Sequence, residues 1–353
     1  MKEWYEGYAA GTDYPSTYIP ELNPFRAFSL MKQFGCLATN EPRHACELGY
    51  GTGLSFILHA AASDVHWWGT DFSPSHAQHA RDLAVDAGLE NAHVFDHFIG
   101  LNGIWSWVSA GNRKILIDFF KRRLRVGGVV YLGYNTFPGH AQMVPVRNLM
   151  KIYFERMTPS GSPELSRAQK SVEEVEKLFE HNPHIAEVYS LAFRTIQSFQ
   201  NYKGSSYVGH EYLNEEWSPM SFCEVAPQLG HAKLRFACSS VPVQNFDIHF
   251  LVENQIEYLN KYDDLEIRET FRDFLINRQF RKDYWIKGGQ PLNTFEIDQQ
   301  SAKQEVVLAV PKAQVARSIS EAVLLKDFDN EILYFILGQL ISHEPRTIMS
   351  ILH

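Results

Sequence analysis

The sequence predicts an α/β fold in which a doubly wound, mainly parallel sheet holds a ligand at the ends of its strands. Two observations support this prediction. A short apolar run ends in Glu47 and a helical pattern begins at Leu54, with glycines at every second position between them: Gly49, Gly51 and Gly53. A second apolar run, 65–69, leads to Asp71, which lies 24 positions after Glu47. The order is therefore strand, glycine turn, helix, strand and acid.

The glycine turn and the acid each have a physical reason to contact a ligand. Glycine has no Cβ, so its backbone can adopt positive φ and approach a ligand closely, while the following helix presents free N–H groups. An acid at the end of the second strand can accept hydrogen bonds from ribose hydroxyls. The loop departs from the G-x-G-x-x-G pattern of dinucleotide sites. A glycine-rich turn without a ligand is the simpler alternative, but it does not explain why turn, helix and acid agree.

Length and composition indicate an ample core and enough chain for two domains. The chain has 353 residues, of which 45% are hydrophobic and 21% charged. Its formal net charge of −8 argues against nonspecific binding to nucleic acid or to an anionic membrane as the main activity. The longest apolar stretch near the C-terminal end, 332–341, is interrupted by polar and small residues and is too short to span a bilayer.

The cysteines predict neither a metal site nor a disulfide framework. They lie far apart and include no C-x-x-C pair: Cys36, Cys46, Cys223 and Cys238. The first residues contain no apolar stretch of the kind found in a secretory signal. We therefore expect reduced thiols, no bound metal and a cytoplasmic location.

Helix start and stop signals flank two segments. Residues 24–34 follow Asn23, a residue type that caps helices. After the spaced acid, Ser73 and Pro74 supply a cap and a favoured first position, and Gly88 supplies a stop. The second helix carries two histidines without the i, i+4 spacing of a metal pair, and we expect both on its solvated face: His76 and His79.

The chain is unusually short between its third and fourth predicted strands. Residues 89–94 resemble the start of a third strand, yet Phe95 and Asp96 already resemble the fourth. A parallel crossover needs a dozen or more residues, so about 15 residues of an ordinary connection are absent between Val94 and Phe95. We interpret this as a segment missing from the sequence rather than as a shortened core.

Beyond these patterns, the sequence resembles the class I S-adenosyl-L-methionine (SAM) methyltransferases. Their motif I corresponds to residues 47–53, and Asp71 stands at the position of their ribose-binding acid. Three further segments are similar to bacterial methyltransferases that carry a methyltransferase regulatory domain: YNTFPG at 134–139, GHEYL at 209–213 and RETFRDFL at 268–275. The resemblance extends over nearly the whole chain. It implies a Rossmann-like core, SAM as cofactor and a relation to bacterial protein-lysine methyltransferases that act on surface proteins.

The resemblance and the helical patterns together predict four parts of the chain. In order, they are an aromatic N-terminal arm with a helix, the Rossmann-like core, a mainly helical inserted regulatory or substrate domain, and a short winged-helix-like module: residues 1–35, 36–139, 140–295 and 296–353. Members of the family usually continue with a further C-terminal region. The last part would be truncated if this chain normally does the same.

The resemblance also assigns candidate site residues. The cofactor candidates come from motif I and from the ends of the second and fourth strands: Glu47, Gly49, Gly51, Gly53, Asp71, Phe72 and Asn102. Within this set, Glu47 is expected either to order the loop or to face the amino group of the cofactor. Because a lysine amine must lose a proton before it accepts a methyl group, a proton acceptor is needed nearby.

The catalytic candidates are polar residues of the arm, the strand ends and the inserted domain: Tyr14, Asn102, Tyr134 and His210. Further residues of the same kinds are Tyr18, Asn135, Tyr207 and Glu211. Each could equally be a packed core residue. For His210 and Glu211 a structural role is favoured, because no second His or Cys accompanies them at ligand spacing.

The sequence therefore predicts a SAM-dependent methyltransferase that transfers a methyl group by direct displacement from the sulfonium. By resemblance, the acceptor is a protein lysine amine. One alternative is an O- or N-methyltransferase of a small molecule or glycan, and another is a non-catalytic module that binds SAM. No nucleic-acid partner and no membrane span are expected. The sequence does not identify the acceptor, the number of methyl groups added or the oligomeric state.

Overall fold

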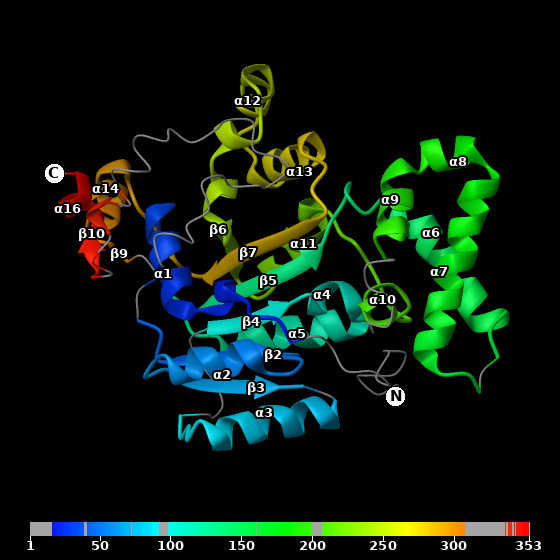
Figure 1. Cartoon of the computed structure of the whole chain (residues 1–353). Coiled ribbons are helices and arrows are strands. Elements are labelled where there is room, and N and C mark those ends of the chain that lie inside the picture. Colours follow the sequence, from blue (N-terminus) through cyan, green and yellow to red (C-terminus); the bar gives the residue numbers. More distant parts are fainter. Residues whose placement is uncertain are drawn as a thin grey trace.

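A six-stranded sheet forms the centre of the protein, with strand order β3-β2-β4-β5-β7-β6 (Figure 1). The computed structural model describes residues 16–38, 41–71, 73–91, 98–159, 161–199, 207–307, 336, 338–340, 342 and 344–352. The strands of this sheet are β2 (His44–Leu48), β3 (His66–Thr70), β4 (Phe98–Asn102), β5 (Val129–Asn135), β6 (Leu234–Ser239) and β7 (Phe280–Lys287).

Five strands of the sheet run in one direction and β7 runs against them. β2 pairs in parallel with β3 and β4, and β4 with β5. β7 is antiparallel to both β5 and β6. All residues of β5 are buried, as expected for a strand that is covered on both faces. Because parallel strands end at the same edge, the residues that follow β2, β3, β4 and β5 gather along one edge of the sheet.

Alternate residues of β5 point into two cores on opposite faces of the sheet. Val129 and Tyr131 pack in a cluster with α1 (Pro24–Gln33) and α2 (Leu54–Ala61), and α3 (Pro74–Asp86) lies against it. Val130 and Leu132 pack on the other face with three further helices: α4 (Ile104–Trp107), α5 (Ala110–Arg123) and α11 (Phe222–Gly230). Both faces are thus covered, which leaves the edge formed by the strand ends for a ligand.

A group of helices with its own core stands beside this edge. Figure 1 shows the group off the ends of β4 and β5, with α10 on the side nearest to α4. Its core contains Met150, Phe179 and Ile196, all of them buried. The helices are α6 (Met143–Arg156), α7 (Glu164–His181), α8 (Pro183–Val188), α9 (Ser190–Ser198) and α10 (Tyr207–Tyr212).

The central sheet takes two of its strands from the segment predicted as an inserted helical domain. β6 and β7 both lie within residues 140–295, and β7 pairs with β5 along the full length of that strand. Backbone hydrogen bonds therefore tie this segment to the first half of the chain. The division at residue 139 stays a prediction, and the helical description fits residues 143–212 better than it fits the remainder.

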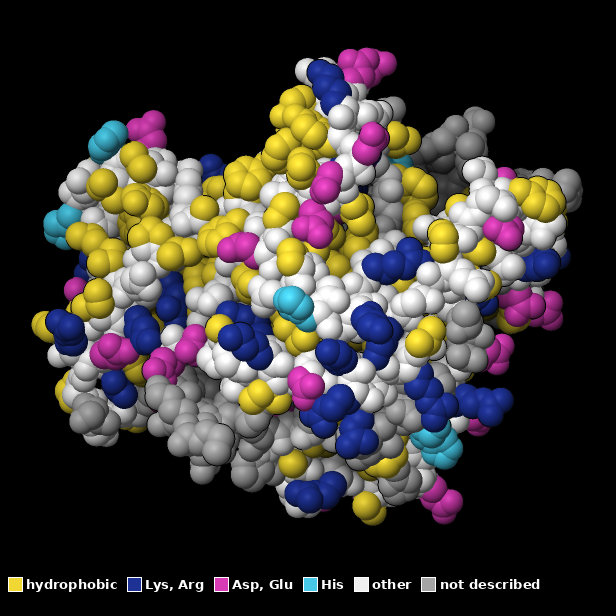
Figure 2. Space-filling view, turned by 180° about the vertical axis from the view of Figure 1, so that it is seen from behind, with side chains coloured by type: hydrophobic (Ala, Val, Ile, Leu, Met, Phe, Trp, Pro, Cys, Tyr) yellow, Lys and Arg dark blue, Asp and Glu magenta, His cyan; other side chains and the backbone are white. Residues whose placement is uncertain are grey.

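A small lobe follows β6 and carries a cluster of buried charges. Its elements are the short helices η3 (Pro242–Asn245) and η4 (Asp247–His249), then α12 (Glu253–Leu259) and α13 (Leu265–Leu275). Seen from behind, apolar side chains gather over the upper part of the molecule, where this lobe lies (Figure 2). Exposed apolar residues of the lobe are Ile248, Val252, Tyr258, Leu265, Ile267 and Phe274.

Arg281 of β7 is the centre of the charge cluster. Its guanidinium donates to Asp273 at 2.9 Å, to Glu269 at 2.8 Å and to Asp283 at 2.6 Å. Asp273 also accepts from Arg278 at 2.7 Å and is fully buried. The cluster therefore holds α13 against β7 by charge-assisted hydrogen bonds in a site without water access.

Shorter elements complete the described chain. They are η1 (Pro20–Leu22), β1 (Cys36–Leu37), β8 (Gln290–Pro291), α14 (Thr294–Ala302), β9 (Glu305–Val306), β10 (Arg346–Thr347) and α16 (Ile348–Leu352). β1 pairs with β8, and β9 pairs with β10. Residues 308–335 lie outside the described part, so the winged-helix-like module stays a prediction.

Two predicted helices are confirmed. α1 begins at Pro24, where the Asn23 side chain accepts hydrogen bonds from Phe25 N and Arg26 N. α3 begins at Pro74 and ends at Asp86. The predicted cap of α3 differs in detail, because the Ser73 hydroxyl pairs with the Ser75 hydroxyl at 2.9 Å and makes no capping bond.

The third strand predicted at residues 89–94 is not formed in its described portion. Residues 89–91 are irregular, although Asn91 O accepts a hydrogen bond from Trp67 N of β3 at 2.7 Å. Residues 92–97, including the predicted junction between Val94 and Phe95, lie outside the described part. β4 begins at Phe98 in the described chain and ends at Asn102, as the loop pattern predicts.

The buried charge cluster predicts a large loss of stability for Asp273→Asn. The substitution removes the charge that two buried guanidinium groups share, and breaking such a buried pair typically costs about 3–5 kcal/mol. We expect a decrease of about 3 kcal/mol in the free energy of unfolding, measured by urea denaturation. The exposed Asp263 offers a matched control, because Asp263→Asn should change this value by less than about 0.5 kcal/mol. Equal effects of the two substitutions would contradict the role of the cluster.

Candidate functional site

The glycine loop between β2 and α2 adopts the conformation that only glycine takes without strain. Gly49, Gly51 and Gly53 have φ of 68°, 58° and 81°. A Cβ at position 49 would lie 2.1 Å from Ile104 Cδ1, so α4 packs directly on the loop. The glycines therefore serve both the turn and the close packing around it.

Asp71 ties the glycine loop to the end of β3. Its Oδ2 accepts a hydrogen bond from Gly51 N at 2.9 Å, and its Oδ1 accepts from Ser73 N at 2.9 Å. Gly49 N donates to Thr70 O at 2.7 Å. The Oδ2 atom has a second lone pair, so Asp71 can still accept a hydrogen bond from a ligand hydroxyl while it orders the loop.

His76 is not on a solvated face as predicted. Its ring is buried, and its Nδ1 lies 3.2 Å from Asp71 Oδ1. His76 is buried for a local reason. Asp71 lies just before α3, and His76 is in the first turns of that helix, on the side that faces the strand end. The other histidine, His79, is exposed as predicted.

Glu47 is a buried acid without a cation. Its side chain is 3% exposed, and its Oε2 makes no hydrogen bond with the described residues. Burial raises the pKa of the Glu47 carboxyl to about 8, and the neighbouring Asp71 adds to the rise. A carboxylate in this position would be stabilised by a positively charged hydrogen-bond donor, which the described protein does not supply.

Asn102 ends β4 with its amide fixed in one orientation. The Asn102 Oδ1 accepts a hydrogen bond from Tyr131 OH at 2.9 Å. A Cβ at position 133 would lie 2.8 Å from the same oxygen, so Gly133 leaves room for it. The Nδ2 group of Asn102 therefore points away from Tyr131 and can donate to a ligand at the strand ends.

Tyr134 lies in the core and not at the sheet edge. Its side chain is fully buried in the cluster that contains Leu132 and Trp285, and its hydroxyl makes no hydrogen bond with the described residues. Burial raises the pKa of Tyr134 well above its ordinary value, while the nearby Arg281 opposes the rise. Its catalytic role stays a prediction without geometric support, because the hydroxyl faces the charge cluster.

Three of the predicted site residues cannot be placed. Tyr14 and Phe72 lie outside the described residues. His210 belongs to α10, but the position of its side chain is not described. The structure thus brings together Glu47, the loop glycines, Asp71 and Asn102 along one edge, and their cofactor role stays a prediction.

Glu211, the residue after His210, also lies at this edge. Its carbonyl accepts a hydrogen bond from Trp107 Nε1 at 3.2 Å. Burial raises the pKa of the Glu211 carboxyl to about 7, and the Asn135 side chain partly offsets this rise. The sequence alone did not single out Trp107. Its position shortly after Asn102, at the end of a strand, is the signal that could have identified it.

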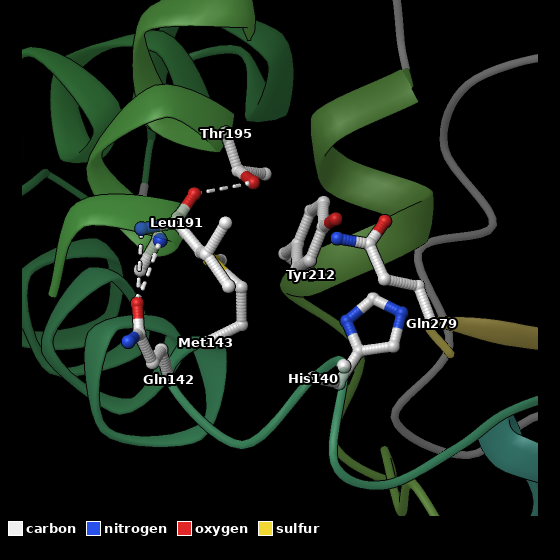
Figure 3. A pocket seen from close by; sticks show the side chains of 9 residues that line it. His140, Gln142, Met143, Leu191, Thr195, Tyr212 and Gln279 are labelled. Carbon is white, nitrogen blue, oxygen red and sulfur yellow. Dashed lines mark hydrogen bonds between the residues drawn. The ribbon is translucent and has the colours of Figure 1, made fainter. Parts of the chain in front are cut away.

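A pocket lies where the turn after β5 meets α6, α9 and α10 (Figure 3). Figure 3 shows His140, Tyr212 and Gln279 next to one another, with Met143, Leu191 and Thr195 opposite them. The full lining is Gly139, His140, Gln142, Met143, Leu191, Ala192, Thr195, Tyr212 and Gln279. Burial lowers the pKa of His140 to about 4, so the ring is neutral near pH 7. The described lining of the pocket therefore carries no charge near pH 7.

Neither a metal site nor a membrane-spanning helix is found among the described residues. No three His, Cys, Asp or Glu side chains of the described ranges gather as a metal would require. No helix in the same ranges has the length and apolar character needed to cross a bilayer.

The sheet order, the glycine loop after β2 and the acid after β3 define a class I methyltransferase fold. The family model of the predicted methyltransferase regulatory domain matches residues 204–287. This match covers α10, α11, the small lobe and β7. The resemblance to methyltransferases that carry this domain is therefore confirmed.

Solved structures share the fold. The structure of PKMT2 from Rickettsia typhi in complex with AdoHcy has a TM-score of 0.73 and 18% sequence identity, covering 96% of this chain and 70% of that one. A second structure of the same Rickettsia typhi protein gives a TM-score of 0.70 with the same coverage. At this level of identity the likeness establishes the fold.

Two curated relatives are longer than this chain. An uncharacterized protein of Synechocystis sp. is 32% identical over 325 residues, which are 87% of this chain and 63% of that protein. An uncharacterized protein of Rickettsia prowazekii is 24% identical over 275 residues, 73% of this chain and 49% of that protein. The chain thus spans between half and two thirds of the length of these relatives.

The raised pKa of Glu47 predicts a loss of stability as pH rises. A glutamate ionises near 4.5 when exposed and near 8 in this site. Between these values the folded state holds a proton that the unfolded state has lost, so the free energy of unfolding falls with increasing pH. Glu47→Gln should flatten this fall between about pH 5.5 and 7.5, measured by urea denaturation. The exposed Glu90 provides the control Glu90→Gln. An unchanged slope in Glu47→Gln would contradict the assignment.

Proposed function

We propose that this chain is a SAM-dependent methyltransferase that transfers a methyl group to a protein lysine amine. One observation carries the proposal: the buried carboxyl of Glu47, which has no cation among the described residues, lies at the end of β2 directly before a glycine loop with positive φ. SAM has an ammonium group in its methionine part and a sulfonium at its centre. Its charges suit a site with an unpaired acid better than those of a dinucleotide would.

The residues of this edge fit the parts of SAM. Glu47 would accept a hydrogen bond from the ammonium group. The glycines at 49, 51 and 53 have no side chains, so the loop would pass close to the ligand. Asp71 would accept from the ribose hydroxyls while it keeps its bond to Gly51 N. The complex of Rickettsia typhi PKMT2 with AdoHcy, the product left after methyl transfer, supports the same ligand for this fold.

The chain's own contribution to transfer would be alignment and exclusion of water. When bound, SAM supplies an electrophilic methyl group, and displacement of sulfur from it needs an in-line nucleophile more than acid catalysis. Asn102 and Asn135 end the two central strands and lie where an acceptor would approach. α10 covers this edge through its contact with Trp107.

The lysine acceptor rests on the sequence resemblance to bacterial protein-lysine methyltransferases. The resemblance also implies separate roles for the sheet and for the helical group. We propose that the sheet binds the cofactor, while α6 to α10, from Met143 to Tyr212, position the acceptor. The uncharged pocket around His140 would hold an apolar or amide portion of the acceptor chain next to the reacting amine.

The cofactor assignment predicts calorimetric binding of SAM and of S-adenosylhomocysteine in the micromolar range, about −8 kcal/mol. Asp71→Ala should weaken the binding of both ligands at least about tenfold. The substitution removes the acceptor of the ribose hydrogen bonds and the hydrogen bond from Gly51 N that orders the loop. Asp86→Ala, an exposed carboxylate at the end of α3, should leave both affinities unchanged. Absence of binding to the wild-type protein, or equal binding by Asp71→Ala, would contradict the assignment.

The acceptor assignment is tested with the same preparation. Labelled methyl groups from SAM should be transferred to poly-L-lysine and not to fully acetylated poly-L-lysine, because acetylation removes the nucleophilic lone pair. Transfer to neither polymer by a protein that binds SAM would count against the lysine acceptor and favour a small-molecule, glycan or binding role.

A further inference from the structure

Glu211 is held at the end of β4 through a chain of contacts. Its carbonyl accepts from Trp107 Nε1 at 3.2 Å. The Trp107 ring lies over Gly103, where an added Cβ would stand 2.4 Å from the ring. Gly103 follows Asn102 directly and donates its N–H to Gly133 O at 3.0 Å. The helix that carries Glu211 is therefore fixed against the ends of the two central strands.

Asn135, at the end of the neighbouring strand, is fixed by its backbone, and its side-chain amide interacts with the Glu211 carboxyl. Its N–H donates to Ser106 Oγ at 2.8 Å, and its carbonyl accepts from Met220 N at 3.1 Å. The residue is 1% exposed, yet its Nδ2 makes no hydrogen bond of normal geometry with the described residues. The interaction with Glu211 leaves the second donor of the amide and the other acceptor positions of the carboxyl open to a ligand.

The Glu211 carboxyl and the Asn135 amide interact with each other, and no cation of the described residues joins them. Glu211 is half-buried, and burial is the main reason why its pKa is raised, to about 7. The Asn135 side chain acts in the opposite direction and favours the ionised form. No described lysine or arginine contributes to this shift in the pKa of Glu211. An ammonium group entering here would gain a charge-assisted hydrogen bond that the described protein does not provide.

We propose that Glu211 and Asn135 form the acceptor subsite of this enzyme and that the subsite selects a primary ammonium group. This proposal rests on the proposed methyltransferase function and deepens it. Glu47 would receive the ammonium of the cofactor, and Glu211 would receive the ammonium of the acceptor. The two acids lie at the ends of different elements of one edge, so the two cations need not compete.

The subsite also accounts for the proton that the acceptor must lose. The ammonium of the acceptor transfers one proton to a Glu211 carboxylate oxygen, which leaves a neutral amine with a free electron pair. That pair forms the new N–C bond to the methyl carbon, while the C–S bond electrons stay on sulfur and neutralise the sulfonium of SAM. The methylated ammonium keeps its charge, and Glu211 returns its proton to water. Atoms, charges and electrons balance without another reactant.

The test compares two small probes on protein saturated with S-adenosylhomocysteine. Nα-acetyl-L-lysine methylamide carries the ammonium, and the norleucine counterpart has the same backbone and an apolar side chain without it. Affinities are measured by NMR titration for wild type, Glu211→Gln, Glu211→Ala and the control Glu215→Gln, whose side chain is exposed close by in the chain. Affinity for S-adenosylhomocysteine itself is measured for each protein by calorimetry.

The proposal predicts that wild type and Glu215→Gln bind the lysine probe at least about tenfold more tightly than the norleucine probe. Glu211→Gln, which keeps the shape of the side chain, should lose this preference while its affinity for S-adenosylhomocysteine changes less than twofold. A wild-type protein without preference, or a Glu211→Gln protein that retains it, would overturn the subsite. Failure of S-adenosylhomocysteine to bind at all would instead overturn the proposed function.

Discussion

The buried ion cluster around Arg281 determines how the second half of the chain joins the first. Arg281 is 2% exposed and donates to three carboxylates, so β7 can occupy its place only when α13 covers it. β7 in turn pairs with every residue of β5. Because removing one partner would leave a buried charge uncompensated, the cluster requires this arrangement of strand and helix.

The same cluster extends to the turn that follows β5. Arg278 donates to Asp273, and its carbonyl accepts from Gly139 N at 3.0 Å. A Cβ at position 139 would lie 2.3 Å from that carbonyl oxygen, so only glycine permits the close approach. The turn is thereby fixed directly after Asn135. The segment that matches the regulatory-domain model, residues 204–287, thus shapes the strand end at which the proposed acceptor subsite lies.

Glu47 and Glu211 contrast with the cluster, because no cation of the described residues accompanies either carboxyl. Each carboxylate of the Arg281 cluster has a guanidinium partner, whereas Glu47 and Glu211 have raised pKa values for which burial is the main cause. The buried carboxylates that join α13 to β7 are paired with guanidinium groups, whereas Glu47 and Glu211 have no cationic partner among the described residues, as is typical of functional sites. Both unpaired acids lie at the edge formed by the strand ends. This difference is the physical basis for the assignment of a cofactor and an acceptor to that edge.

Local patterns made the cofactor edge predictable from the sequence. Gly49, Gly51 and Gly53 all needed positive φ, and the apolar runs before Glu47 and Asp71 placed both acids at strand ends. Contacts between distant segments were not predictable in this way. The burial of His76 against Asp71 depends on the direction in which α3 leaves the strand. The pairing of β7 with β5 and the approach of Glu211 to Asn135 depend on tertiary packing, which no periodicity records.

The most direct test of this account measures whether Glu47 recognises the ammonium of the ligand. Calorimetry would compare S-adenosylhomocysteine with 5′-methylthioadenosine, which lacks the amino-acid part, in wild type and in Glu47→Gln. If Glu47 binds the ammonium, Glu47→Gln weakens the affinity for S-adenosylhomocysteine at least about tenfold, which is the contribution of one charge-assisted hydrogen bond. It should change the affinity for 5′-methylthioadenosine less than twofold. An equal loss for both ligands would show that Glu47 acts only by ordering the loop and would contradict the account.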